Sequence, residues 1–384
     1  MVLIPDQRQV FMDASVNRIA SSADERALLI SLVLKGETPE KAEYSFEELH
    51  LLVKTAGAII VDTLTVKRDS VDPAFILGKG YVEIVRNLIA EKEIKLIVFD
   101  LTNIRPVQIR NLEDTLKCRV VGRNEIILDI FARRARSAEA KIQVELAQLR
   151  YILPRLKGLG GVLSRLGGGI GTRGPGEKML ETDRRHILRR VDTLKAKLKK
   201  YEEHRKRTRN SRRGELLGAV VGYTNAGKST LINLLAKDDL FVEDRLFATL
   251  DSYTRTVFIR EGFKTLLTDT VGFIQNLPAN LIESFRSTLE DIENSDYIIH
   301  AVDINAPDIE SNIQTVVQEL NSLEIEGKPL ILFFNKTDAA DEMKINVVKN
   351  RYPDAVFGSA KTGTGISELK DRIDSLQDIL NKKG

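Results

Sequence analysis

The sequence predicts an α/β protein in which two α/β domains are joined by a helical hairpin. Strand-like and helix-like segments alternate over residues 1–130 and again over residues 214–384. Such alternation is typical of domains with a mostly parallel sheet. Residues 131–213 instead carry long helical patterns, a glycine-rich stretch and many basic side chains. We therefore expect an N-terminal α/β domain over 1–130, an antiparallel hairpin with a glycine-rich loop over 131–213 and a C-terminal α/β domain over 214–384.

The composition of the 384 residues excludes several classes of protein. Apolar residues make up 42% and charged residues 29% of the chain, which is ordinary for a folded globular protein. No apolar run reaches the roughly 18 residues that a membrane helix needs, and the first residues lack the pattern of a secretory signal. The single cysteine, Cys118, cannot form an internal disulfide, which fits a reducing compartment. We expect a cytoplasmic monomer without membrane insertion.

The N-terminal domain is predicted to contain four strands and three helices. The strands are expected at 27–34, 58–66, 95–100 and 117–121, and the helices at 45–55, 80–93 and 105–116. Ser45 and Glu48 have the spacing of a capping box, which predicts that the first helix starts at Ser45. The sequence Gly78-Lys79-Gly80 leaves two interpretations open, a tight turn before a helix or a backbone that approaches a phosphate.

The middle segment is predicted to fold as two helices with narrow apolar seams. Over residues 124–153 apolar side chains recur at spacings of three and four, and a second helical pattern resumes at about Glu181. The second helix has the 4-3-4-3 spacing of a coiled coil at Ile187, Val191, Leu194, Leu198 and Tyr201. Since each helix can bury its seam on the other, the pattern predicts an antiparallel pair.

The charge of the chain is concentrated in this hairpin. Residues 131–213 hold 24 Lys and Arg against 8 Asp and Glu, so the segment carries +16 while the whole chain carries +3. Nine of the 19 residues over 158–176 are glycine. Basic residues lie within or directly beside this stretch at Arg155, Lys157, Arg165, Arg173 and Lys178. A mobile backbone with spaced guanidinium groups suits the phosphates and unpaired bases of RNA. A linker with a solvated charged surface is the alternative.

A phosphate-binding loop opens the C-terminal domain. An apolar strand at 215–222 runs into Gly222–Ser229, and an apolar helix follows over 229–236. This is the motif GxxxxGK[ST] in the context of strand, loop and helix that it requires. Its glycines let the backbone wrap phosphates, Lys228 reaches the β- and γ-phosphates, and the Ser229 hydroxyl is a ligand for Mg²⁺.

A second group of residues predicts that the base is guanine. A strand at 328–334 ends in Asn335-Lys336-Thr337-Asp338. The Asp338 carboxylate can accept hydrogen bonds from guanine N1–H and the 2-amino group, whereas adenine offers neither. Asn335 is expected to tie this loop to the phosphate loop, and the Lys336 stem to cover the base. A backbone N–H of Ser359-Ala360-Lys361 can bond guanine O6.

Two further segments are predicted to sense the γ-phosphate. A strand at 266–269 leads into Asp269-Thr270-Val271-Gly272, where Asp269 would hold a water of Mg²⁺ and the Gly272 N–H would meet the γ-phosphate. Upstream, Thr249 is our choice for a switch threonine that binds Mg²⁺ in the triphosphate state, with Thr254 as the alternative. A β-hairpin fits between Thr249 and Asp269.

These motifs give a complete set of predicted site residues. The catalytic group comprises Lys228, Thr249 and Gly272, and the Mg²⁺ ligands comprise Ser229, Thr249 and Asp269. The nucleotide is predicted to contact Gly222, Tyr223, Thr224, Asn225, Ala226, Gly227, Lys228, Ser229, Thr230, Phe247, Ala248, Thr249, Leu250, Asp251, Asp269, Thr270, Val271, Gly272, Asn335, Lys336, Thr337, Asp338, Ser359, Ala360 and Lys361.

With these motifs the chain resembles the HflX family of translational GTPases. The resemblance rests on GYTNAGKST, FATLDSYTR, DTVGFI, NKTD and SAK, and above all on the segment GGGIGTRGPGEKMLETDRR ahead of the phosphate loop. It runs over nearly the whole chain and implies an N-terminal α/β domain, a hairpin linker and a Ras-like P-loop GTPase domain. One departure lies at Leu250-Asp251-Ser252-Tyr253-Thr254, where the family often has Asp-Pro-Thr.

The resemblance also implies partners. Members bind the large ribosomal subunit and its RNA, which stimulates hydrolysis of GTP to GDP, and some act in rescue or splitting of stalled or stressed ribosomes. ATP hydrolysis is reported in the family as well, which makes ATP a candidate ligand of the N-terminal region. The alternative function is an RNA-binding or protein-binding switch whose GTP or GDP state gates partner binding.

The residue after Gly272 predicts slow intrinsic hydrolysis. Many Ras-like enzymes have a Gln there that orients the attacking water, but this chain has Phe273. A partner or another residue must therefore supply the missing group. Asn225 in the phosphate loop leaves two interpretations open, a K⁺ ion that bridges the phosphates or an ordinary loop side chain.

Overall fold

The computed structural model describes residues 25–163, 175–210, 215–237, 246–247, 250, 253–275, 286–325 and 327–381. The chain divides into two compact units, residues 1–200 with 278–284 and residues 201–277 with 285–384. The predicted domain boundaries near 130 and 213 stay predictions. No helix in the described part of the chain is long and apolar enough to cross a membrane.

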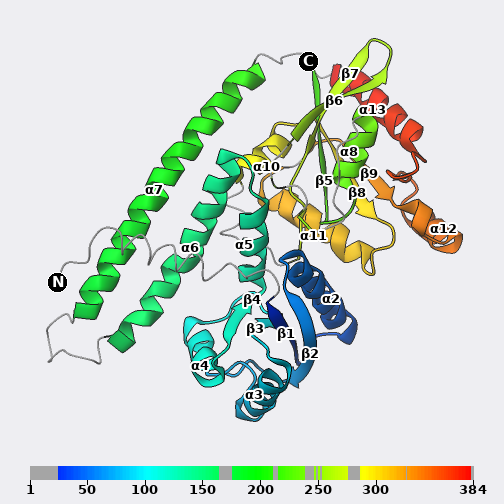
Figure 1. Ribbon diagram of the computed structural model, residues 1–384. Helices are drawn as coiled ribbons and strands as arrows, with labels where there is room; N and C mark the ends of the chain where they lie inside the picture. Colours follow the sequence, from blue (N-terminus) through cyan, green and yellow to red (C-terminus); the bar gives the residue numbers. More distant parts are fainter. Residues whose placement is uncertain are drawn as a thin grey trace. The chain divides into compact units, whose positions relative to one another are not determined.

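The N-terminal unit contains a four-stranded parallel sheet in the order β2-β1-β3-β4 (Figure 1). Its strands are β1 (Arg26–Leu34), β2 (Ile59–Arg68), β3 (Leu96–Phe99) and β4 (Arg119–Gly122). The helices beside it are α2 (Pro39–Thr55), α3 (Lys79–Lys92) and α4 (Pro106–Leu116). Alternate residues of β1 serve opposite faces, and Leu28 and Ile30 join the apolar core that α3 and α4 complete. The predicted α/β domain with a parallel sheet is confirmed.

Helix α2 begins earlier than predicted. Pro39 occupies its first turn after an extended Thr38, a position that favours proline because its fixed φ suits a helix start. Ser45 and Glu48 therefore lie inside the helix, and the predicted capping box is wrong. Both residues instead contact Arg123, which follows β4 in the chain.

Arg123 is the centre of a buried ionic cluster. Its side chain is 2% exposed and forms ion pairs with Glu48 and, at 2.9 Å, with Asp100. Its Nη1 also donates to the Ser45 hydroxyl at 3.0 Å. Asp100 follows β3 and Arg123 follows β4, so the cluster joins the carboxyl end of the sheet to α2.

The predicted helix over 124–153 is two helices. α5 (Arg123–Arg134) ends where Ala135 takes an extended conformation, and α6 (Ala138–Leu163) begins three residues after that cap. The Ser137 hydroxyl accepts a hydrogen bond from the Ala140 amide at 3.0 Å and so caps α6. The apolar spacing hid this break because Ala135 and Ala138 continue the helical pattern.

Helices α6 and α7 (Pro175–Asn210) form the predicted antiparallel hairpin (Figure 1). α7 begins six residues before the predicted Glu181. The apolar seam combines residues of both helices, Leu146 and Leu149 with Ile187, Val191, Leu194 and Leu198. Glu145 of α6 and Arg190 of α7 flank the seam with two hydrogen bonds of 2.6 and 2.9 Å.

Arg155 supports the fold of this unit. Its guanidinium lies 3.3 Å from the centre of the Tyr151 ring and 3.4 Å from the Glu125 carboxylate, and the Tyr151 hydroxyl donates to Glu125. Burial raises the pKa of Glu125, while Arg155 acts in the opposite direction. Arg155 therefore joins α6 to α5, and the expectation that it also faces RNA stays a prediction. The side chains of the other four predicted RNA-facing residues, Lys157, Arg165, Arg173 and Lys178, lie outside the described residues.

The second unit contains a six-stranded sheet in the order β10-β9-β8-β5-β7-β6. Every neighbouring pair is parallel except β6 with β7. Its strands are β5 (Leu216–Gly222), β6 (Tyr253–Arg260), β7 (Phe263–Asp269), β8 (Tyr297–Asp303), β9 (Leu330–Asn335) and β10 (Val356–Phe357). Its helices are α8 (Lys228–Ala236), α10 (Arg286–Glu293), α11 (Ile309–Ser322), the 3₁₀ turn η2 (Thr337–Ala339), α12 (Glu342–Arg351) and α13 (Ile366–Asn381).

Helices pack against this sheet in two core clusters. Residues of α8 and α13 join one core cluster with β5, β7 and β8, while α11 and α12 residues join another with β8 and β9. The chain order turns at β5, since β7 lies on one side of it and β8 on the other. Ligands of open α/β sheets bind outside the carboxyl ends of the strands at such a point.

Removal of the Arg123 side chain should destabilise the N-terminal unit strongly. Arg123→Ala leaves the Glu48 and Asp100 carboxylates buried without their cation, which costs about 3–5 kcal/mol. The matched control is Arg110→Ala, whose partner Asp114 lies 3.5 Å away on the surface, and its cost is below about 1 kcal/mol. Urea unfolding of the full chain, followed by far-ultraviolet circular dichroism, measures both. Equal losses in the two variants would contradict the central role of the buried cluster.

Candidate functional site

The phosphate loop lies between β5 and α8 in a conformation that two glycines permit. Gly222 has φ of +155°, and a Cβ there would lie 2.2 Å from the Ala301 carbonyl of β8. Gly227 has φ of +84°, and a Cβ there would lie 2.3 Å from the side-chain nitrogen of Asn335. The backbone can therefore pass close to β8 and β9 only without side chains at these two positions.

Asn335 joins three parts of the site. Its buried side chain donates from Nδ2 to the Ala226 carbonyl at 2.9 Å and accepts at Oδ1 from the Ala360 amide at 2.8 Å. The predicted tie between the end of β9 and the phosphate loop is therefore present. The Asn335 side chain also fixes the loop 359–361 through its bond to Ala360. A backbone N–H of this loop is expected to bond guanine.

The residues expected to contact the base lie in the loops after β9 and β10. Asp338 is exposed in η2, and Lys361 is exposed after β10. Lys336 has φ of +65° and its ammonium lies 2.8 Å from the Asp303 carboxylate at the end of β8. The Thr337 amide donates to the Gly358 carbonyl at 3.2 Å, which joins the two base-side loops.

Lys228 is buried beneath the phosphate loop. Its Nζ donates to the carbonyls of Gly222 and Tyr223 at 3.2 and 3.0 Å. Burial lowers the pKa of Lys228 to about 8, and the nearby Asp269 opposes this shift. An incoming polyphosphate would supply the negative charge that favours the ammonium form.

Ser229 and Asp269 lie together, as the predicted Mg²⁺ site requires. The Ser229 hydroxyl donates to Asp269 Oδ2 at 2.6 Å. Mg²⁺ prefers oxygen ligands and usually takes only one or two from the protein, with water and substrate phosphates completing the octahedron. A hydroxyl and a carboxylate at the phosphate loop fit this ion. The described residues include no cluster of three or more His, Cys, Asp or Glu that could hold a metal by itself.

The segment Asp269–Gly272 lies directly against the phosphate loop. Thr270 donates from its hydroxyl to the Val220 carbonyl at 2.8 Å, which fixes the segment beside β5. A Cβ on Gly272 would lie 2.9 Å from Thr224 Cα and 3.0 Å from Lys228 Nζ. The structure thus brings the predicted γ-phosphate sensor next to the lysine expected to bind the same phosphate.

The predicted switch residues are described only in part. Phe247 and Leu250 are buried, and Phe247 has φ of +53°. Ala248, Thr249 and Asp251 lie outside the described residues, so the role of Thr249 stays a prediction. The expected β-hairpin before Asp269 is present as β6 and β7. Thr254, the alternative, lies in β6 with its hydroxyl 3.0 Å from that of Thr268.

Two features of the site escaped the sequence analysis. The Tyr223 hydroxyl accepts a hydrogen bond from the Gln275 amide at 2.9 Å, a contact that no motif indicates. His300 in β8 is buried and, within the described residues, its Nδ1 has no hydrogen-bond partner. Burial, reinforced by Lys228, lowers the pKa of His300 to about 3. The signal for His300 was a histidine inside the otherwise apolar strand YIIHAVD.

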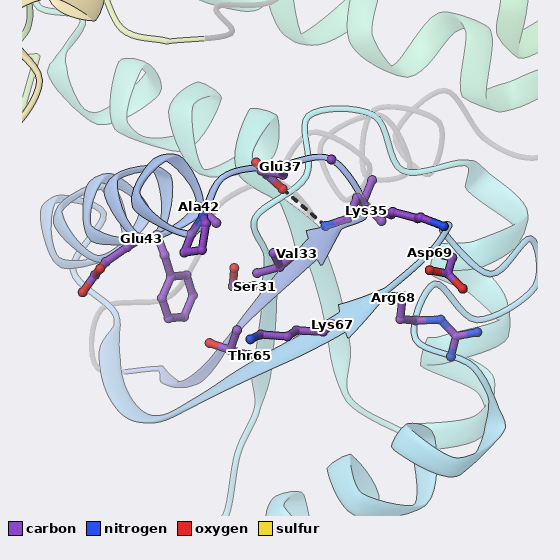
Figure 2. Close-up of a pocket in the computed structure, with 14 residues that line it drawn as sticks. Ser31, Val33, Lys35, Glu37, Ala42, Glu43, Thr65, Lys67, Arg68 and Asp69 are labelled. Atoms are coloured by element: carbon purple, nitrogen blue, oxygen red, sulfur yellow. Dashed lines mark hydrogen bonds between the residues drawn. The ribbon is translucent and has the colours of Figure 1, made fainter.

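A pocket of about 750 Å³ lies in the N-terminal unit at the carboxyl ends of β1 and β2 (Figure 2). Its basic side chains are Lys35, Lys67 and Arg68, its acidic ones Glu37, Glu43 and Asp69, and Phe46 of α2 adds an aromatic ring. Gly78-Lys79-Gly80 is not part of this lining. Gly78 precedes α3 with φ of +84°, and a Cβ there would lie 2.5 Å from Arg68 Nη1. The tight-turn interpretation of that sequence therefore fits its packing.

Comparison with known families covers most of the chain. Residues 43–132 match a family described as GTP-binding GTPase N-terminal, and residues 134–212 match GTP-binding GTPase Middle Region. Residues 218–336 match a family described as 50S ribosome-binding GTPase.

Individual relatives agree with these matches. GTPase HflX of Lacrimispora saccharolytica is 47% identical, over 92% of this chain and 83% of its own length. GTPase HflX of Alkalihalophilus pseudofirmus is 45% identical over 91% and 82%, and that of Escherichia coli K12 is 37% identical over 90% and 82%. A crystal structure of SsGBP in complex with GDP has a similar fold, with a TM-score of 0.51 and 24% identity over 93% of this chain and 99% of that chain.

The lowered pKa of Lys228 predicts pH-dependent nucleotide binding. Below about pH 8 Lys228 is already charged in the empty site, so GDP affinity should not change with pH. Above that value the lysine must take up a proton on binding, and affinity should fall by up to about tenfold per pH unit. Calorimetric titration with GDP between about pH 7 and 9 measures this. Lys228→Arg is the control, because arginine keeps its charge. A flat profile in the unmodified protein would contradict the shifted pKa.

Proposed function

The chain belongs to the HflX family of GTPases, and from this membership we propose that its GTP hydrolysis is coupled to the large ribosomal subunit. The chain binds GTP and hydrolyses it to GDP. The proposal adds that the protein binds the large subunit through ribosomal RNA and acts in rescue or splitting of stalled or stressed ribosomes. The match of residues 218–336 to a family described as 50S ribosome-binding GTPase supports it.

The observation that carries the proposal is the basic surface of α7. Its apolar seam is buried on α6, so its charged side chains face solvent. The exposed basic residues between 184 and 200 are Arg184, Arg185, Arg189, Lys195, Lys197, Lys199 and Lys200. A surface of this kind, within a segment of net charge +16, suits the phosphate backbone of RNA.

The residues of the GTPase site have different roles in this proposal. The phosphate loop and Lys228 hold the β- and γ-phosphates, and Gly272 offers its N–H to the γ-phosphate. Ser229 and Asp269 would hold Mg²⁺, with Thr249 as the further predicted ligand. When bound, this ion neutralises charge on the phosphates. Asp338 selects guanine, and Asn335 keeps the base-side loop on the phosphate loop.

The residue that follows Gly272 cannot orient the attacking water. Phe273, which follows Gly272, is buried and cannot orient water by hydrogen bonding. We propose that the large subunit supplies or orders the missing group. Asn225 is exposed in the phosphate loop with φ of +62°. A K⁺ ion beside Asn225 and an ordinary loop role remain the two alternatives for this residue.

Charge reversal on α7 tests the proposed RNA contact. In Lys195→Glu/Lys199→Glu, loss of two phosphate contacts should reduce the salt dependence of log affinity for large subunits by roughly 1.4–1.8 units. Cosedimentation over a range of salt concentrations, with a non-hydrolysable GTP analogue, measures the slope.

The control is Lys344→Glu/Lys349→Glu in α12, which changes the net charge equally. It should leave the slope unchanged if the hairpin is the RNA-binding surface. Equal slopes for the hairpin variant and the unmodified protein would refute this surface as the contact.

A second candidate function concerns the N-terminal pocket. The family resemblance makes ATP a candidate ligand of this region, and the pocket supplies Lys35 and Lys67 for phosphates and the Phe46 ring for a base. We propose the pocket as the ATP site.

The test is ATP binding by equilibrium dialysis with excess GDP present to occupy the GTPase site. Lys35→Ala/Lys67→Ala should weaken ATP binding at least about tenfold, since a hydrogen bond to a charged group contributes about 1.5–3 kcal/mol. Lys41→Ala/Lys54→Ala on exposed positions of α2 is the control. Unchanged ATP affinity in the pocket variant would refute the proposal that this pocket binds ATP.

A further inference from the structure

The segment that follows Gly272 is attached to the phosphate loop by three hydrogen bonds. The Thr224 amide donates to the Phe273 carbonyl at 2.7 Å, and the Phe273 amide donates to the Gly222 carbonyl at 3.1 Å. The third bond runs from the Gln275 amide to the Tyr223 hydroxyl at 2.9 Å. The first two extend the β5–β7 pairing by one parallel bridge, between Tyr223 and Phe273. The third depends on a side chain.

The side chains around these hydrogen bonds are buried. Tyr223, Phe273 and Ile274 are all buried, and Ile274 is fully so. The hydroxyl is therefore partly shielded from competing water, which increases the cost of losing its hydrogen bond. On the far side, the Gln275 side chain donates to the Ser311 hydroxyl of α11 at 3.0 Å. Gln275 is thus held from two directions, by the phosphate loop and by α11.

The attachment determines where Gly272 lies. Gly272 immediately precedes Phe273, and its hypothetical Cβ would lie within 3.0 Å of both Thr224 and Lys228 Nζ. Its backbone is therefore held beside the ammonium group that binds the γ-phosphate. A donor that is already in place when the reaction begins has no reorganisation cost in the transition state.

We propose that Tyr223 is a positioning residue for GTP hydrolysis, which acts by holding the Gly272 segment on the phosphate loop through its hydroxyl. The two backbone bonds fix only Phe273, whereas the tyrosine fixes Gln275 and so limits rotation of the whole segment. This matters more in a site where Phe273 replaces a water-orienting glutamine. Phosphate binding itself uses backbone amides and Lys228, so the hydroxyl is not needed to bind GDP.

Tyr223→Phe removes the hydroxyl and keeps the buried ring. The single-turnover rate of GTP hydrolysis should fall about 2- to 10-fold, the effect of one ordinary hydrogen bond, while GDP affinity stays the same. Amide hydrogen exchange at Gln275 should become faster by a similar factor in the GDP-bound protein. A purely structural role for the tyrosine would not separate turnover from GDP affinity in this way.

Tyr297→Phe is the matched control. Tyr297 is another buried tyrosine of the same unit, at the start of β8, the end of the strand opposite the phosphate loop. Its hydroxyl lies 3.0 Å from the Thr265 hydroxyl of β7. Its loss should lower stability by an amount comparable with Tyr223→Phe and leave single-turnover hydrolysis unchanged.

Three results would overturn the proposal. The first is an unchanged hydrolysis rate in Tyr223→Phe. The second is a loss of GDP affinity by the same factor as the rate, which would show a general defect of the phosphate loop. The third is an equal loss of rate in Tyr297→Phe, which would show an effect of stability alone.

Discussion

The hydrogen bonds of the Asn335 side-chain amide are the interaction on which the rest of the nucleotide site depends. The loops that follow β5, β9 and β10 must keep fixed positions relative to one another. Only then can one nucleotide contact the phosphate-binding residues and the base-binding residues at the same time. Asn335 bonds the Ala226 carbonyl in one direction and the Ala360 amide in the other. Because its amide is buried, neither bond can be replaced by water without a cost. Gly227 has no side chain at the point where this amide approaches, so the position of the phosphate loop is set by β9.

Hydrogen bonds also connect the phosphate loop to Gly272, the predicted γ-phosphate sensor. Backbone bonds from Thr224 and Phe273 continue the β5–β7 pairing beyond the strands, and burial of Lys228 beneath them leaves an ammonium with a lowered pKa. The negative charge of a bound polyphosphate would favour the charged form of Lys228. The basic helix α7, by contrast, owes its exposed face to the apolar seam that it buries on α6. The charge of Lys228 is therefore buried in one unit of the chain, whereas the basic charge of α7 between residues 184 and 200 is exposed in the other.

Local patterns in the sequence predicted much of this structure. The parallel sheets, the phosphate loop, the hairpin seam and the Asn335 tie all follow from short motifs or from periodicity. The errors arose where distant residues decide the outcome. Ser45 and Glu48 looked like a cap, but they contact Arg123, 78 residues from Ser45 in the chain. The break between α5 and α6 was hidden because alanines preserve the helical spacing. The Tyr223–Gln275 bond joins residues 52 apart, and no pattern signals a hydroxyl that meets a backbone amide.

The central claim is that a GTPase whose Phe273 cannot orient water receives the missing contribution from the large ribosomal subunit. Steady-state GTP turnover, measured with and without purified large subunits at fixed salt, tests it most directly. Groups supplied in trans raise the rates of such enzymes by roughly 10³–10⁵, so we expect turnover to rise by orders of magnitude when large subunits are added and to respond little to small subunits. Equal turnover in the presence and absence of large subunits would contradict the account.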